Sequence, residues 1–202
     1  MKTWIVLTVL ITVIILIAGI YTMTIAKTET QKYEVLYSKN NFEIRIYPEA
    51  ILASVQMKGS FDDTRNSGFG VLAGYIFGGN TESTKIAMTS PVRMSTESNL
   101  NTMSFVMPSE MEFEKLPHPN DTNIVLHQSK TMYTASLRFG GYASDAEILK
   151  YKKQLNEKLD QMKIKHTGNF EFLGYNPPFQ PVNRRNEVQV ELTRFNSDML
   201  PE

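Results

Sequence analysis

Residues 144–164 read SDAEILKYKKQLNEKLDQMKI, and this stretch predicts an amphipathic helix. Ser144 lies three residues before Glu147, which is the spacing of a capping box, so the helix is predicted to run from Asp145 to about Ile164. Its apolar residues recur at three-to-four spacing opposite a highly charged face. They are Ile148, Leu149, Leu155, Leu159 and Met162. Such a helix must pack its apolar face against another element.

Strands are predicted on both sides of this helix, because apolar and polar residues alternate there with a period of two. Before the helix, the strand candidates are residues 124–127 and 132–139; after it, they are residues 170–175 and 187–192. The second half of the chain is therefore predicted to be strand, strand, helix, strand, strand.

The first half of the chain repeats the same order. Strands are predicted at 42–47, 51–58, 85–94 and 103–107. Ser60 and Asp63 have capping-box spacing and predict a helix to about Phe77, which Gly78-Gly79-Asn80 would terminate. Two similar halves at an offset of roughly 80 residues predict an internally duplicated α+β fold, with an antiparallel sheet or barrel that carries two helices.

The N-terminus carries a long apolar segment. Residues 3–26 contain no charged side chain, and as a helix they would reach about 36 Å, which is enough to cross a bilayer. We expect residues 1–26 to be an uncleaved membrane anchor that enters the bilayer through residues 4–26. A signal peptide cleaved near Ala26 is the alternative, because Lys2 supplies a positive start and Thr24-Ile25-Ala26 resembles a cleavage site.

The predicted domain boundaries follow from this segment. Residues 27–32 are expected to be a linker, residues 33–193 one folded domain, and residues 194–202 a C-terminal tail. A short N-terminal tail stays most simply in the cytoplasm, which would place the domain of a single-pass protein on the extracytoplasmic side. Cleavage would instead give a secreted or periplasmic protein.

Composition excludes several classes of function. The 202 residues contain 21 Lys+Arg and 21 Asp+Glu, so no strong general attraction to nucleic acid is expected. The absence of cysteine excludes disulfides, iron–sulfur clusters and thiolate chemistry. The three histidines, His118, His127 and His166, lack the spacing of a metal site, so no bound metal is expected.

Two motifs have competing interpretations. Residues 68–73, GFGVLA, match the letters of a dinucleotide fingerprint but lie inside a predicted helix, so we interpret them as small residues that let a sheet or a ligand approach closely. Near the C-terminus, an aromatic, proline-rich loop precedes Arg184 and Arg185. This loop could hold a flat apolar molecule with an anionic group, or its arginines could pair with Glu187 or Glu191.

Five ordered motifs together resemble the SOUL haem-binding family. They are Gly74-Tyr75-Ile76-Phe77-Gly78-Gly79-Asn80, Lys85-Ile86-Ala87-Met88-Thr89-Ser90-Pro91-Val92, Phe105-Val106-Met107-Pro108-Ser109, residues 174–179 and residues 183–188. The resemblance spans residues 33–192, and Ser90 stands where the family more often has alanine.

The resemblance implies a distorted antiparallel β-barrel built from two similar β-β-α-β-β halves with two packed helices. It also implies non-covalent binding of haem or a related tetrapyrrole in an apolar groove beside the first helix. Carried onto this chain, the cofactor-binding residues would be Phe69, Ala73 and Phe77 from the helix, Tyr175 and Phe179 from the late loop, and Arg184 or Arg185 for the propionates.

The chain departs from some family members at three further positions. Ile46 stands where some members carry a histidine, and Asn66 and Gly74 stand where others have basic residues on the groove side of the helix. Haem would then be held by burial without an axial protein ligand, for carriage, buffering or delivery near a membrane. The alternative is a membrane-tethered module that holds a protein or lipid partner without haem. No catalytic constellation can be found in the sequence, so an enzyme is not expected; only analogy of fold would suggest one.

Overall fold

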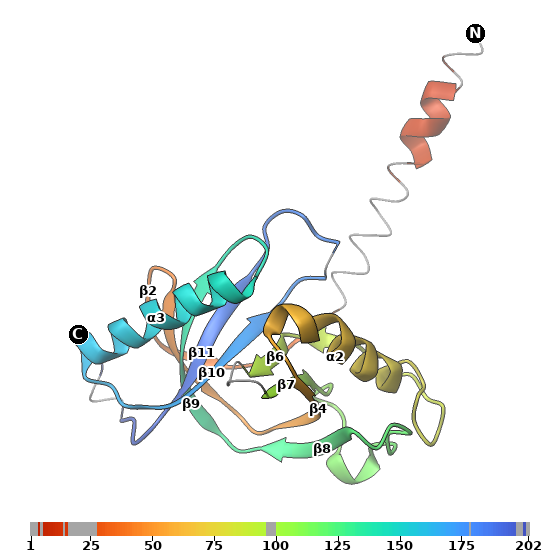
Figure 1. The fold of residues 1–202 in the computed structure, drawn as a ribbon. Helices are drawn as coiled ribbons and strands as arrows, with labels where there is room; N and C mark the ends of the chain where they lie inside the picture. The colour runs from red at the N-terminus through yellow and green to blue at the C-terminus, as the bar shows by residue number, and fades with distance from the viewer. Residues whose placement is uncertain are drawn as a thin grey trace.

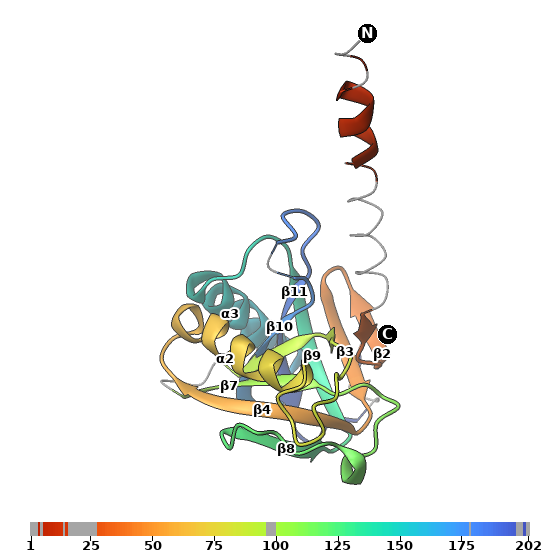
Figure 2. The same cartoon turned by 90° about the vertical axis from the view of Figure 1, so that its right-hand side faces the viewer.

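The computed structural model describes residues 4, 6–13, 15, 28–95, 100–177, 179–196 and 200. A nine-stranded sheet forms the body of the domain, and two long helices lie on the same side of it (Figures 1 and 2). The strands are β1 (Glu29–Thr30), β2 (Glu34–Lys39), β3 (Phe42–Tyr47), β4 (Ala50–Lys58), β5 (Thr89–Ser90), β6 (Val92–Ser95), β7 (Leu100–Val106), β8 (Ile124–Ser129), β9 (Met132–Phe139), β10 (His166–Gly174) and β11 (Asn186–Leu192). The helices are α2 (Phe61–Ile76), the short 3-10 helix η1 (Phe113–Lys115) and α3 (Asp145–Met162).

The two predicted halves are present, and they exchange their first strands. One half is β3, β4, α2, β6 and β7, and the other is β8, β9, α3, β10 and β11. However, β3 pairs with β9 of the second half, and β8 pairs with β4 of the first. The sheet order is therefore β2-β3-β9-β11-β10-β6-β7-β4-β8.

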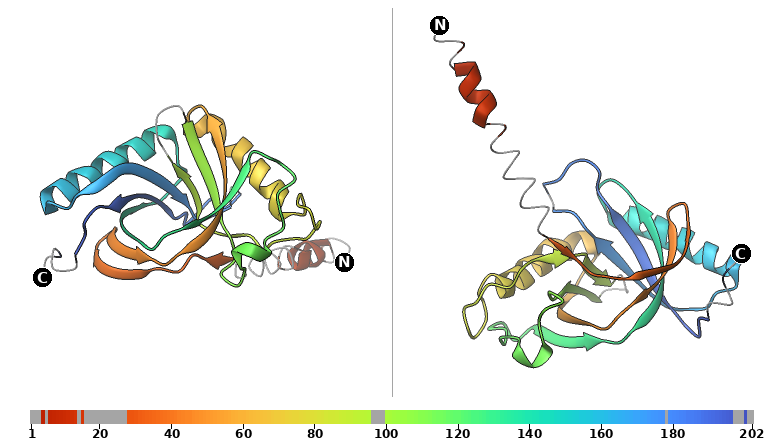
Figure 3. Two further views of the ribbon diagram at one scale, coloured as in Figure 1. Left: turned by 90° about the horizontal axis from the view of Figure 1, so that it is seen from below. Right: turned by 180° about the vertical axis from the view of Figure 1, so that it is seen from behind.

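The large antiparallel sheet is present, but the distorted β-barrel that the resemblance implied does not close. A barrel requires its first and last strands to pair, but in the described part of the chain the edge strands β2 and β8 do not pair with each other. The sheet is strongly curved and remains open (Figure 3). A small second sheet, in which β1 pairs in parallel with β5, lies outside it.

The core lies between the helices and the sheet. Leu72, Tyr75 and Ile76 of α2 are buried there, and α3 contributes Ile148, Leu155 and Leu159, as the periodicity predicted. Met162 is partly buried against the core, but Leu149, which was predicted on the same apolar face, is 67% exposed. Helix α2 contacts β4 and β7, whereas α3 contacts β9 and β11. Each helix therefore covers its own half of the sheet.

The two helices begin side by side and cap each other. The carboxylate of Asp145 accepts hydrogen bonds from the backbone N–H groups of Phe61 (3.1 Å) and Asp62 (3.3 Å). In return, Asp62 accepts one from the backbone N–H of Asp145 (3.3 Å). Free N–H groups at helix starts attract anions, so each aspartate stabilises the opposite helix.

Both predicted N-caps are present, although only one forms a complete capping box. Ser60 and Asp63 bond to each other's backbone reciprocally at the start of α2. At α3, Ser144 accepts from the backbone N–H of Glu147, whereas the Glu147 carboxylate pairs with Lys150.

The strand predicted at 85–94 is the main local difference. Only Thr89–Ser90 and Val92–Ser95 are extended and paired, and Pro91 separates them because it has no backbone N–H to donate to a ladder. Two further strands, β1 and β2, were not predicted; β1 lies within the predicted 27–32 linker.

The predicted membrane anchor falls largely outside the described residues, which include Trp4 and residues 6–13 and 15 of it. Within the described parts of the chain, no helix is both long enough and apolar enough to span a bilayer.

Candidate functional site

The face of the sheet opposite the helices is lined by polar side chains. On β3, Phe42 and Ile44 belong to the core, so Arg45, the residue after Ile44, points to the other face. The same alternation on β11 places Glu187 and Gln189 opposite Val188 and Val190. The sequence predicted β3 as a half-buried strand, but Arg45 is only 2% exposed because the curved sheet encloses its polar face as well.

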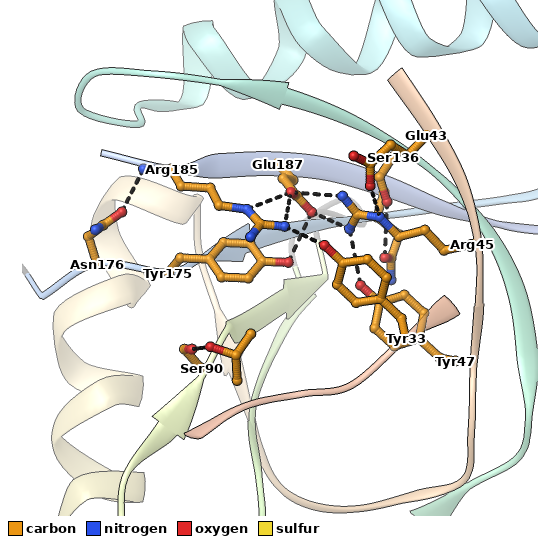
Figure 4. A network of polar contacts seen from close by, with 12 residues as sticks. Tyr33, Glu43, Arg45, Tyr47, Ser90, Ser136, Tyr175, Asn176, Arg185 and Glu187 are labelled. Atoms are coloured by element: carbon orange, nitrogen blue, oxygen red, sulfur yellow. Dashed lines mark hydrogen bonds and ion pairs between the residues drawn. The ribbon is translucent and has the colours of Figure 1, made fainter. Parts of the chain in front are cut away.

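The carboxylate of Glu187 lies at the centre of this face, as Figure 4 shows, and is fully buried. It accepts two hydrogen bonds from the guanidinium of Arg45, at 2.6 and 3.0 Å. Arg185 pairs with it from the other side at 2.7 Å, and the Tyr175 hydroxyl donates to it at 3.0 Å. One carboxylate thus links β3 and β11 to the start of the β10–β11 loop.

Three tyrosines enclose these charges. The Arg45 guanidinium lies over the ring of Tyr33, 4.2 Å from its centroid, and the Arg185 guanidinium lies 3.9 Å from the centroid of Tyr175. The Tyr33 hydroxyl accepts from Arg185 at 2.8 Å, and the Tyr47 hydroxyl accepts from Arg45 at 3.2 Å. Rings over guanidinium groups keep water away and add cation–π attraction. We call Tyr33, Arg45, Tyr47, Tyr175, Arg185 and Glu187 the buried network.

The pKa values of the network reflect its burial and pairing. Burial by itself raises the pKa of Glu187, but the hydrogen bonds and charges of Arg45 and Arg185 outweigh it and hold that pKa below its usual 4.5. Burial raises the pKa of Tyr175, and the neighbouring Tyr47 and Glu187 raise it further. Burial likewise raises the pKa of Tyr47, against the opposing effect of Arg45. The network is therefore stable with Glu187 charged and the tyrosines protonated.

We expect the domain to lose stability above about pH 10. Tyr47 and Tyr175 have folded-state pKa values above the unfolded value of 10.0, so their contribution is complete below that pH and is lost as the pH rises through the folded values. A titration of tyrosinate absorbance should show these rings ionising only when the circular dichroism of the fold is lost. In the variant Tyr175→Phe, the tyrosinate absorbance that appears on unfolding should be smaller. If Tyr47 and Tyr175 both ionise before the domain unfolds, their burial in the network is contradicted.

The other late-loop arginine, Arg184, closes the β10–β11 loop. Its guanidinium donates to the backbone carbonyls of Pro177 and Gln180, both at 2.9 Å. It also lies over the ring of Tyr142, 4.6 Å from the centroid, and so attaches the loop before α3 to this one. Of the two interpretations of the arginine pair, pairing with Glu187 is confirmed for Arg185.

The outer face of α2 has a different character. Phe69, Ala73 and Phe77 follow one line along it, and Phe77 is 63% exposed. Beside this line, Gly70 and Gly74 are exposed, and a Cβ added at either would meet no atom within 4 Å. Gly68 faces the sheet, where an added Cβ would lie 2.4 Å from the sulfur of Met57. The interpretation that small residues allow close approach is confirmed for Gly68 and the sheet.

The predicted cofactor-binding residues thus occupy two places. Phe69 packs edge-on against Phe105 of β7, with ring centroids 5.3 Å apart. Tyr175, Arg184 and Arg185 belong to the β10–β11 loop and its base, and Phe179 is exposed on that loop. Both arginines already have partners within the protein.

Sequence reasoning missed Arg45, Tyr33 and Tyr47 as members of the network. The available signal was the pair of charged residues Glu43 and Arg45 on the polar face of the alternating strand, with Glu187 already considered as a partner for arginine. Among the described residues, no group of three or more metal-binding side chains comes together, and His118, His127 and His166 lie on separate elements.

Comparison with known proteins gives related sequences and folds. A family model described as SOUL heme-binding protein matches residues 28–191. Heme-binding protein 1 of Xenopus laevis is 30% identical over 155 residues, which cover 73% of this chain and 81% of that protein. Human heme-binding protein 2 is 30% identical over 162 residues, covering 73% and 76%. The crystal structure of the EcmrR C-terminal domain superposes with a TM-score of 0.60 at 11% identity, over 81% of this chain and 99% of that one, which shows likeness of fold alone.

Proposed function

The chain belongs to the SOUL heme-binding protein family, and from this membership we propose that it binds haem or a related tetrapyrrole non-covalently on the outer face of α2. Its relatives are named heme-binding proteins, which supports binding rather than catalysis. The role we propose is carriage, buffering or delivery of the tetrapyrrole beside a membrane.

The observation that carries this proposal is the shape of α2. Gly70 lies in the interior of α2, where a glycine destabilises a helix by about 1 kcal/mol relative to alanine, and Gly74 lies in its last turn. Nothing in the fold requires them, because a Cβ at Gly70 or Gly74 would point into open space. Without those Cβ atoms, a flat ring can approach the backbone between Phe69 and Phe77 and bury their exposed rings.

The structure suggests a limited role for the arginines. Arg185 is held by Glu187 and Tyr33, so a propionate would have to compete with a buried carboxylate for it. Arg184 donates to two loop carbonyls with one terminal nitrogen. We therefore propose that burial against α2 supplies most of the affinity, with no axial ligand from the protein.

The proposal is tested with residues 27–202, which contain the whole described sheet and core. Haem is titrated while its Soret band is followed, and an iron-free porphyrin is titrated in parallel by fluorescence. We expect saturable one-to-one binding of both, with similar affinities. If haem binds but the iron-free porphyrin does not, binding without an axial ligand from the protein is refuted. If neither ligand binds saturably, the proposed tetrapyrrole site is refuted.

Phe77→Asp should weaken porphyrin binding by at least about tenfold, or about 1.4 kcal/mol, because it places a charge in the proposed apolar surface. Phe77 is the cleaner position, since Phe69 also packs on Phe105. Leu149→Asp is the matched control: Leu149 is 67% exposed on α3, away from the proposed site, and its replacement should leave affinity unchanged. If Phe77→Asp and Leu149→Asp bind porphyrin with equal affinity, α2 is not the binding surface.

A second candidate is a membrane-tethered module that holds a protein or lipid partner without haem. The internal engagement of Arg184 and Arg185, together with Ile46 where some members have histidine, favours it. This candidate would be supported if neither haem nor the iron-free porphyrin binds saturably and another partner binds in a way that depends on Phe77.

For localisation we propose a single-pass membrane protein anchored by residues 4–26, with the domain on the extracytoplasmic side. The uncharged run of residues 3–26 supports this placement. Release after cleavage near Ala26 is the alternative, and the N-terminal sequence of the purified native protein distinguishes the two.

A further inference from the structure

The uncharged N-terminal run ends very close to the folded domain. The run extends to Ala26, and β1 begins at Glu29, already paired with β5. Three residues span at most about 10 Å even when fully extended. If residues 4–26 lie in a bilayer, as the proposed localisation has it, the face of the domain that carries β1 must lie beside the lipid headgroups.

The β10–β11 loop projects from that same face. Tyr33, four residues after Glu29, shares a hydrogen bond with Arg185 at the base of the loop. In Figures 1 and 2, the blue β10–β11 loop extends from the side of the domain at which β1 enters, and β8 lies at the opposite end. The short connection therefore orients this loop toward the membrane.

The tip of the loop carries large apolar side chains that the fold leaves exposed. Val182 and Phe179 are each 66% exposed, and Tyr142 from the neighbouring loop is 59% exposed beside Arg184. Hydrogen bonds hold the tip in shape, including those from Gln180 to the carbonyls of Pro177 (3.1 Å) and Val182 (3.0 Å). We call Tyr142, Phe179 and Val182 the loop-tip patch.

We propose that the loop-tip patch docks into the surface of the bilayer that the N-terminal anchor enters. This inference rests on the proposed membrane localisation. Aromatic and apolar side chains on a stiff loop partition into the interfacial region of a bilayer. With the anchor as a tether, even a weak interaction is favoured by high local concentration. Docking would fix the orientation of the domain and hold α2 at a constant height above the lipid.

The test uses single-cysteine labels in the full chain, which has no native cysteine. Val182→Cys carries an environment-sensitive fluorophore on the patch. Val125→Cys is the matched control, because it replaces the same residue type at 59% exposure on β8. Both proteins are reconstituted into vesicles of equal parts phosphatidylcholine and phosphatidylglycerol that contain acyl-chain spin-label quenchers, and flotation confirms insertion.

We expect the label at 182 to show blue-shifted emission and severalfold stronger quenching than the label at 125. If the protein floats with the vesicles and the two labels are quenched equally, docking is refuted while the anchor stands. If the protein does not float, both the anchor and the docking proposal are refuted. A blue shift at 182 without quenching by the lipid would indicate a protein contact at the patch instead, and would also overturn the proposal.

Discussion

Replacing Glu187 by alanine is expected to lower the free energy of unfolding by about 3 kcal/mol, because the buried Arg45 guanidinium loses the carboxylate that accepts two of its hydrogen bonds and keeps only Glu43, at 2.7 Å, as an anionic partner. The total stability of a domain is typically about 5–15 kcal/mol, so this single change should remove a large part of it. Arg185 is affected less, since its side chain is 26% exposed and can reach water. Urea denaturation followed by circular dichroism measures the loss.

Two further variants separate pairing from simple packing. Glu191→Ala removes an exposed carboxylate from the same strand and should have an effect near zero. The double variant Arg45→Met/Glu187→Leu replaces the pair by apolar groups and should be clearly more stable than Glu187→Ala. If the double variant is instead less stable than Glu187→Ala, the stability lost in Glu187→Ala does not come from an unpaired charge on Arg45.

The double variant Gly70→Ala/Gly74→Ala is expected to change stability and ligand binding in opposite directions. Each added Cβ meets nothing within 4 Å, so the helix should gain about 1 kcal/mol at Gly70 and less at Gly74, which lies in the last turn. The same methyl groups would keep a flat ring away from the α2 backbone, so we expect porphyrin binding to weaken by about tenfold, or about 1.4 kcal/mol. Urea denaturation and the porphyrin titration supply the two measurements.

Gly68→Ala is the matched control on the inner face of the same helix. Its Cβ would lie 2.4 Å from the Met57 sulfur, so some of the helix gain should be offset by displacement of that side chain. Porphyrin binding should be unchanged, because Gly68 faces the sheet. A double variant that is more stable and binds porphyrin normally would mean that the exposed glycines have no part in the ligand site.

Local patterns predicted the helices and most of the strands. The capping box at Ser60 and the apolar spacing of Ile148, Leu155 and Leu159 depend only on neighbours in the sequence, and both are confirmed, whereas Leu149 of the same predicted face is exposed. The sequence also supported two similar halves. The exchange of β3 and β8 between them could not be predicted, because strand alternation indicates which face a residue occupies but not which strand pairs with it.

Local sequence patterns could not predict the buried network, for the same reason. Arg45 and Glu187 are 142 residues apart in sequence, and only the pairing of β3 and β11 with the common neighbour β9 brings them together. An arginine on an alternating strand is usually exposed. Arg45 is buried instead because the sheet curves around its polar face. The outer face of α2 was easier to predict, because the positions of Phe69, Ala73 and Phe77 follow from one helical period.

The exchanged strands have a consequence for how the chain acquires its structure. The strand that completes the first half, β8, is made after that half, and β3, which pairs with β2 along one edge, lacks a partner along its other edge until β9 has been synthesised. Neither half can therefore complete its hydrogen bonds during translation before the other exists. Contacts between such distant segments slow folding and make it all-or-none, so the domain should fold in one cooperative step after synthesis rather than half by half.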